Sequence, residues 1–164
     1  MIRVLPHSPT MGENYLQNPD AEDPLSNSWS NYFGCPRVRS TAEMHAGTAS
    51  MQYTTNSATN PQGAIVYHAR VQASGTFRGS AWVKGTPGQN IDIRLRLHPS
   101  SAEVAGAVYI LTGGWDFVQT VAYSITGRTQ APCAPALEIL FSNPAASGRV
   151  MYIDDVAVVQ TSTA

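Results

Sequence analysis

The 164-residue sequence is poor in charge: Asp, Glu, Lys and Arg make up 13% of it, and the formal net charge is −1. A chain of this balance, without a run of Lys or Arg, has no general attraction to nucleic acid. The sequence also lacks an apolar run approaching the ~20 residues that cross a membrane. We therefore expect neither a nucleic-acid partner nor a membrane partner.

Motifs of common catalytic sites are missing as well. The sequence has no nucleophile elbow, P-loop, dinucleotide fingerprint or His-rich metal motif. Its four histidines are scattered, and a structural hydrogen bond is the expected role of His45. Asp154 and Asp155 are neighbours on one predicted strand, so their side chains diverge and do not suit glycoside hydrolysis. We expect a protein that is not an enzyme.

Cysteine is scarce. Cys35 and Cys133 lie 98 positions apart and have no metal-binding spacing. Two separate thiols are the favoured interpretation, and a disulfide between distant strands is the alternative.

What the chain does contain is period-two alternation. In the segment 91–98 (IDIRLRLH), the apolar residues point one way and the polar residues the other, as in a strand with one buried face. The segment 24–40 is expected to be mainly loop, with Trp29, Tyr32 and Phe33 as a rim or a plug of one end. The other predicted strands cover 48–54, 64–72, 76–84, 104–111, 115–125, 136–141 and 150–159. Strands at this spacing, with turn residues between them, predict an all-β, two-sheet antiparallel β-sandwich.

The predicted organisation is an N-terminal arm at 1–13, a β-sandwich at 14–160 and a C-terminal tail at 161–164. The start of the chain, MIRVLPHSPTMGEN, lacks the apolar segment of a signal peptide. We therefore expect synthesis in the cytoplasm, with release by lysis or another route if the protein leaves the cell.

The closing strand carries two adjacent carboxylates, Asp154 and Asp155, in an otherwise apolar run. Carboxylates are rarely buried unless they are paired or bind a metal. This "YIDDV" strand resembles the last strand of family 4/9-type carbohydrate-binding modules. Those are galactose-binding-like jelly rolls found in polysaccharide-degrading enzymes and in bacteriophage tail and capsid proteins. Four further segments resemble motifs of that family in order: 14–22 (NYLQNPDAE), 45–51 (HAGTASM), 79–85 (GSAWVKG) and 111–115 (LTGGW).

The resemblance implies a structural calcium ion beside the first and last strands. Its ligands would be carboxylate and main-chain oxygens, which suit a hard cation. The matching positions are Glu22, Gly47, Thr48, and Asp154 or Asp155. The alternative is that an Asp caps the loop through backbone N–H bonds. Ala21 stands where the family has an aromatic residue, which places the local geometry in question.

The resemblance also implies a sugar-binding face with aromatic rings and hydrogen-bonding groups. If the strands 80–84 and 91–98 adjoin, that face would carry Trp82, Lys84, Arg94, Arg96 and Glu138. The alternative is a Trp half covered by Arg stems, with the guanidinium groups paired to acids. Trp115 is expected in the core.

Three functions follow from the resemblance. We favour a non-catalytic virion protein, a capsid decoration or stabilising protein that forms homo-oligomers on a lattice. Its arm, through Ile2, Val4 and Leu5, would lie on a coat protein. The alternatives are a glycan-adsorption module of a phage tail or fibre and a cellular polysaccharide-binding module.

Overall fold

The computed structural model describes residues 14, 16, 20–23, 29–58, 60–66, 75–98, 102–125, 134–142 and 147–162. Within them the chain forms strands and turns, and no helix is long and apolar enough to cross a membrane. The strands are β1 (Trp29–Tyr32), β2 (Arg37–Ser40), β3 (Ser50–Thr54), β4 (Gly63–Val66), β5 (Gly75–Gly85), β6 (Asn90–His98), β7 (Ala102–Ile110), β8 (Trp115–Gln119), β9 (Tyr123–Ile125), β10 (Ala134–Phe141) and β11 (Val150–Ser162).

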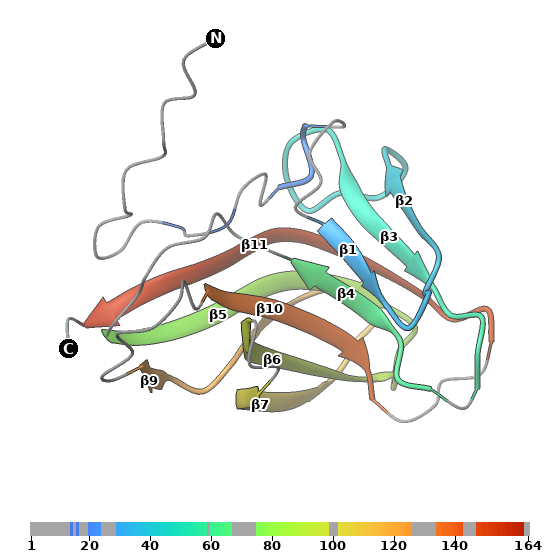
Figure 1. Ribbon diagram of the computed structural model, residues 1–164. Coiled ribbons are helices and arrows are strands. Elements are labelled where there is room, and N and C mark those ends of the chain that lie inside the picture. The colour runs from blue at the N-terminus through green and yellow to red at the C-terminus, as the bar shows by residue number, and fades with distance from the viewer. Residues whose placement is uncertain are drawn as a thin grey trace, which may run out of the picture.

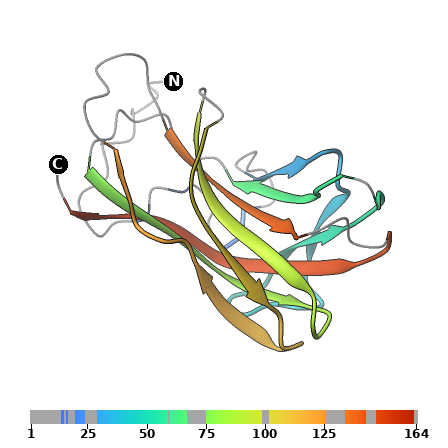
Figure 2. The same cartoon turned by 90° about the horizontal axis from the view of Figure 1, so that it is seen from below.

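The strands form two antiparallel sheets. One has the order β1-β4-β10-β6-β7, and the other has the order β2-β3-β11-β5-β8, with β9 also paired to β5. The two sheets stack as the layers of a sandwich, and β11 runs along much of its length (Figures 1 and 2). The predicted all-β, two-sheet jelly roll is confirmed.

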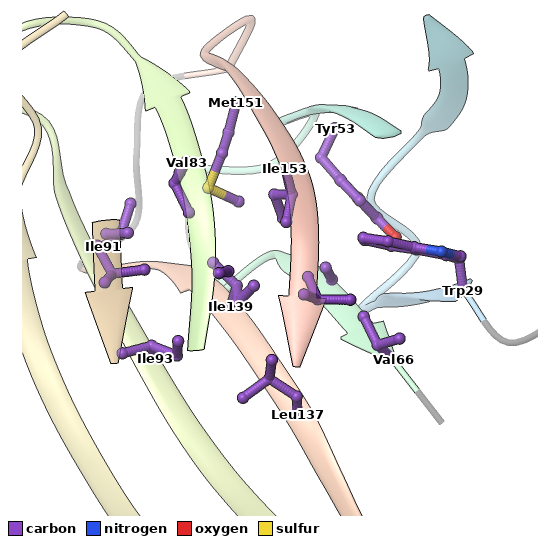
Figure 3. Packing of buried hydrophobic residues seen from close by; sticks show 14 of the residues in the cluster. Trp29, Tyr53, Val66, Val83, Ile91, Ile93, Leu137, Ile139, Met151 and Ile153 are labelled. Atoms are coloured by element: carbon purple, nitrogen blue, oxygen red, sulfur yellow. The ribbon is translucent and has the colours of Figure 1, made fainter. Parts of the chain in front are cut away.

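The core lies between the sheets. Along β5, burial alternates residue by residue, so that Phe77, Ala81 and Val83 face inward. Figure 3 shows Val83, Met151 and Ile153 from the six-stranded sheet beside Ile91, Ile93 and Ile139 from the five-stranded sheet. All six side chains are fully buried. Burial of this apolar surface is the main stabilising contribution to the fold.

A bulge interrupts β11 at the two adjacent carboxylates. The pairing with β5 shifts register between Asp154 and Ala157, and Asp155 has a φ of 46°. Because the bulge adds a residue, Ile153 and Asp154 are both fully buried, and Asp155 is half-exposed. This backbone irregularity explains how a strand otherwise made for the core accommodates two carboxylates.

Several boundaries differ from the sequence predictions. The 24–40 segment contains β1 and β2, which sequence analysis assigned to loop. The predicted 115–125 strand is two strands, both paired with β5. β11 extends to Ser162, which pairs with Thr76, so the strand passes the predicted end of the sandwich at 160. The arm residues Ile2, Val4 and Leu5 lie outside the described residues, as does Cys133.

Candidate functional site

The predicted sugar-binding residues lie on two different surfaces. Trp82 and Lys84 are on β5 of the six-stranded sheet, whereas Arg94 and Arg96 are on β6 of the five-stranded sheet. Glu138, on β10, belongs with the two arginines. The prediction of one shared face was wrong, because the chain crosses from one sheet to the other between β5 and β6.

Glu138 is the centre of a charged cluster on the outer side of the five-stranded sheet. It pairs in register with Arg94, and its side chain is 0% exposed. Its Oε1 lies 2.9 Å from Nε of Arg96, and its Oε2 lies 3.9 Å from Nε of Arg94. Arg94 Nη2 is also 2.8 Å from Oδ2 of Asp92. Strand periodicity places Asp92, Arg94 and Arg96 together, because every second residue of β6 points outward.

An aromatic ring borders this cluster. Arg96 Nη2 donates a hydrogen bond to the Tyr32 hydroxyl at 3.2 Å, and the guanidinium carbon lies 5.5 Å from the centre of the Tyr32 ring. The neighbouring Phe33 is 59% exposed and meets Tyr32 edge-on. We call Tyr32, Asp92, Arg94, Arg96 and Glu138 the charged face.

Exposed apolar residues lie on the other side of the charged face. Val108 and Ile110 of β7 pair in register with Asp92 and Asn90 of β6, and both are more than 60% exposed. The outer surface of this sheet thus has an apolar edge, fixed charges in the middle and an aromatic edge. Such a mixture of apolar contact and oriented polar groups is typical of small-molecule sites.

The loop 41–49 lies against the other sheet and is held by two carboxylates. Glu22 accepts hydrogen bonds from Thr48 N at 2.6 Å, from Ala49 N at 3.0 Å and from the Thr48 hydroxyl. Asp154 accepts hydrogen bonds from His45 N at 2.8 Å and from Ala46 N at 3.3 Å. We call Glu22, Asp154 and the loop N–H groups the carboxylate clasp.

The pKa values of the two carboxylates in the clasp are shifted in opposite directions. The hydrogen bond from the Thr48 hydroxyl, followed by that from Thr48 N, lowers the pKa of Glu22. Burial raises the pKa of Asp154, although the N–H donors of His45, Ala46 and Asp155 oppose the change. The carboxylate of Asp155 instead contacts Nδ1 of His45 at 2.7 Å. The two adjacent acids therefore contact different groups of His45, Asp154 its main-chain N–H and Asp155 its ring, and His45 has the structural contacts expected of it.

The arrangement of the clasp can be compared with the predicted calcium site. Carboxylate oxygens suit the ion, and here those of Glu22 and Asp154 accept hydrogen bonds from N–H groups of the loop. The described residues also contain no group of three or more His, Cys, Asp or Glu side chains placed to bind a metal. Of the predicted ligands, Glu22, Thr48 and Asp154 take part in the hydrogen-bonded clasp, Asp155 contacts His45, and Gly47 lies in the loop. The calcium site stays a prediction.

The two tryptophans of the six-stranded sheet differ from their predicted roles. His45 stacks on Trp82 with ring centres 4.0 Å apart and an angle of 13° between the rings, and Phe117 lies 5.3 Å from Trp82. Trp82 is therefore packed against protein rings. Trp115 is half-exposed on the outer surface, opposite Lys84, so its predicted place in the core was wrong.

Two members of the charged face, Asp92 and Tyr32, were not among the residues predicted for the sugar-binding face. Asp92 shares the outward side of the 91–98 alternation with Arg94 and Arg96, and that signal could have identified it. Tyr32 had no such signal, because only the tertiary pairing of β1 with β4, and of β4 with β10, brings it to this sheet.

Comparisons with known proteins place the fold. No protein-family model and no curated protein matches the chain. Among solved structures, the CBM22-1 xylan-binding domain of Paenibacillus barcinonensis Xyn10C is 16% identical, with a TM-score of 0.70 over 96% of this chain and 100% of that chain. TmCBM61 in complex with β-1,4-galactotriose is 16% identical, with a TM-score of 0.63 over 90% and 99%.

Part of an enzyme also matches. The MgGH51 α-L-arabinofuranosidase bound to arabinose is 9% identical, with a TM-score of 0.72 over 91% of this chain. The chain spans only 26% of the length of that enzyme. At these identities the matches establish a jelly roll like that of carbohydrate-binding modules.

Proposed function

We propose that the protein is a non-catalytic carbohydrate-binding module and that the charged face of the five-stranded sheet contacts the glycan. The observation that carries this proposal is the complete burial of Glu138 between two guanidinium groups outside the hydrophobic core. A buried ion pair is a weak source of stability, because desolvation offsets most of the attraction. Charged groups that are held in place beside apolar surface are more typical of ligand sites.

The geometry supplies what a sugar needs. A guanidinium has five N–H donors in a rigid fork. Among the described residues, Arg96 uses Nε toward Glu138 and Nη2 toward Tyr32, so Nη1 is available for a sugar hydroxyl. The rings of Tyr32 and Phe33 on one side, and Val108 and Ile110 on the other, offer apolar surface to the C–H groups of a sugar.

Two of the similar structures support a glycan ligand, since one was solved with galactotriose and the other is a xylan-binding domain. The charged face, as defined by its described residues, holds two arginines and two acids, so its formal charge is balanced. We therefore propose a neutral glycan as the ligand. The virion role predicted from the sequence depends on residues 1–13, which lie outside the described residues, and it stays a prediction.

Affinity electrophoresis through gels containing soluble xylan or β-1,4-galactan tests the proposal. Wild-type protein should be retarded by at least one of the two polysaccharides, and Glu138→Gln should be retarded less. Asp20→Asn is the matched control, because Asp20 is an acid outside the charged face whose Oδ1 accepts a hydrogen bond from Glu22 N. Equal mobility of all three proteins with and without polysaccharide would contradict the proposal.

A further inference from the structure

The outer surface of the six-stranded sheet carries a row of side chains at one level of five neighbouring strands. Trp115 on β8 pairs in register with Lys84 on β5, and Lys84 with Tyr152 on β11. Tyr152 pairs with Gln52 on β3, and Gln52 with Val38 on β2. We call Trp115, Lys84, Tyr152, Gln52 and Val38 the cross-strand row.

The row points away from the core. Val83, Met151, Ile153 and Tyr53, which flank it along the strands, are fully buried, so the alternate residues face outward. Each member of the row is half-buried except Val38, which is 55% exposed. An apolar surface that is contiguous and rimmed by polar residues can mark an interaction site.

The spacing of the row suits an extended ligand. Neighbouring strands lie ~4.8 Å apart, so Trp115 and Tyr152 are separated by ~9.6 Å, with Lys84 between them. Polar groups alternate with the rings: Lys84 lies between Trp115 and Tyr152, and Gln52 lies beyond Tyr152. A protein interface would have a continuous apolar centre, whereas a sugar chain presents C–H patches and hydroxyls in turn.

The charges around the cross-strand row indicate the charge of the ligand. Nζ of Lys84 is 2.7 Å from Oε2 of Glu43, so the one cation in the row is neutralised by a residue of the loop 41–49. The same loop places His45 5.8 Å from Trp115, and so forms a border along one side of the row. A neutral ligand matches this surface better than an acidic one.

We propose that the cross-strand row is a second carbohydrate-binding surface, on the sheet opposite the charged face, for an extended neutral polysaccharide that runs across the strands. Stacking on Trp115 and Tyr152 supplies contact area, and Lys84 and Gln52 supply hydrogen bonds to hydroxyls. A module with ligand surfaces on both outer faces of its sandwich can bridge two polysaccharide chains, which adds avidity. This proposal does not depend on the charged face.

The test uses the full chain, with soluble xylan and soluble β-1,4-galactan as the probes. Trp115→Ala and Tyr152→Ala should each weaken binding to at least one probe by about tenfold, whereas Tyr152→Phe keeps the ring and should bind within about twofold of wild type. Circular dichroism and thermal melting establish that each variant is folded. In the variant Glu138→Gln, the row should still bind, and the tryptophan fluorescence should still respond to the probe unless Trp115 is also replaced.

Three results would contradict the proposal that the cross-strand row binds carbohydrate. The first is polysaccharide binding that is unchanged in both alanine variants. The second is the absence of binding to either probe by Glu138→Gln, together with binding by wild type, which would assign all affinity to the charged face. The third is a wild-type dimer that Trp115→Ala converts to a monomer without change in glycan binding, which would make the row a contact between copies of the chain. Binding that persists in Glu138→Gln but is lost in Trp115→Ala would instead contradict the charged face and support the row.

Discussion

Nε of Arg96 lies 2.9 Å from Oε1 of Glu138, and the Glu138 side chain has no solvent exposure. The pair lies on the outer side of a sheet whose inner side forms the core, so the ion pair is separate from the apolar packing of the sandwich. Removing one member of a buried pair leaves the other charge uncompensated.

Replacement of Glu138 tests this relationship through stability. Glu138→Ala should lower the free energy of unfolding by ~3–5 kcal/mol, because Arg94 and Arg96 lose their shared carboxylate. Glu43→Ala, which breaks the partly exposed pair with Lys84, should cost no more than ~1 kcal/mol. Urea denaturation of both variants measures the difference. Similar small losses in the two variants would show that Glu138 is not a buried partner.

Gly47 tests the carboxylate clasp. It has a φ of 66°, and a Cβ at this position would collide with Oε1 of Glu22. Gly47→Ala should therefore displace Glu22 from Thr48 and Ala49 and lower the melting temperature. Gly34→Ala is the matched control, because Gly34 has a φ of 67° and open space around it. Both variants carry the backbone strain of a positive φ. The additional loss in Gly47→Ala measures the clasp, and equal losses would count against it.

The clasp also predicts a pH dependence. Hydrogen bonds to the ionised carboxylate hold the pKa of Glu22 below its ordinary value of 4.5. Its contribution is therefore complete above pH 4.5 and is lost as the pH falls through the lower, folded-state pKa. Wild type should be more stable than Glu22→Gln at pH 6, and the two should converge in more acidic solution. The pKa of Asp154 is raised, so its contribution to stability depends on pH in the opposite sense. Because wild type and Glu22→Gln both contain Asp154, this contribution cancels in the difference between them. A constant difference between wild type and variant from pH 6 to pH 3 would contradict this origin.

A metal titration separates the clasp from the calcium hypothesis. If N–H donors satisfy Glu22 and Asp154 as described, the melting temperature should be the same in millimolar EDTA and in millimolar calcium. A ligand that binds only the folded state raises stability with concentration. A melting temperature that rises steadily with calcium, and does so less in Glu22→Gln, would support the predicted metal site instead.

Much of the fold could be predicted from the sequence, and the reason is periodicity. The alternation in 91–98 gave both the existence and the inward side of β6, since Ile91, Ile93 and Leu95 are fully buried. By contrast, β1 and β2 are four residues each, too short for a convincing alternation, and they are strands because β4 and β3 supply partners. Short strands of this kind are defined by tertiary pairing.

The candidate site was less predictable. Sequence periodicity correctly placed Trp82 and Arg94 on the outward sides of their own strands, but it carries no information about which sheet each strand joins. Periodicity could not place Trp115 either, because a large apolar residue at the start of a strand can lie in the core or on the outer surface of an edge strand. The bulge at Asp154 and Asp155 is a backbone feature that alternation alone cannot locate.

The charged face is tested most directly by an NMR titration of isotope-labelled protein with soluble xylan and with β-1,4-galactan. We expect at least one of the two polysaccharides to shift the backbone resonances of Arg94, Arg96, Glu138 and Tyr32, and these shifts to be lost in Glu138→Gln. Resonances of core residues of the other sheet, such as Val158, should not shift. Binding that leaves all four charged-face residues unshifted, or no shift with either polysaccharide, would contradict the central claim.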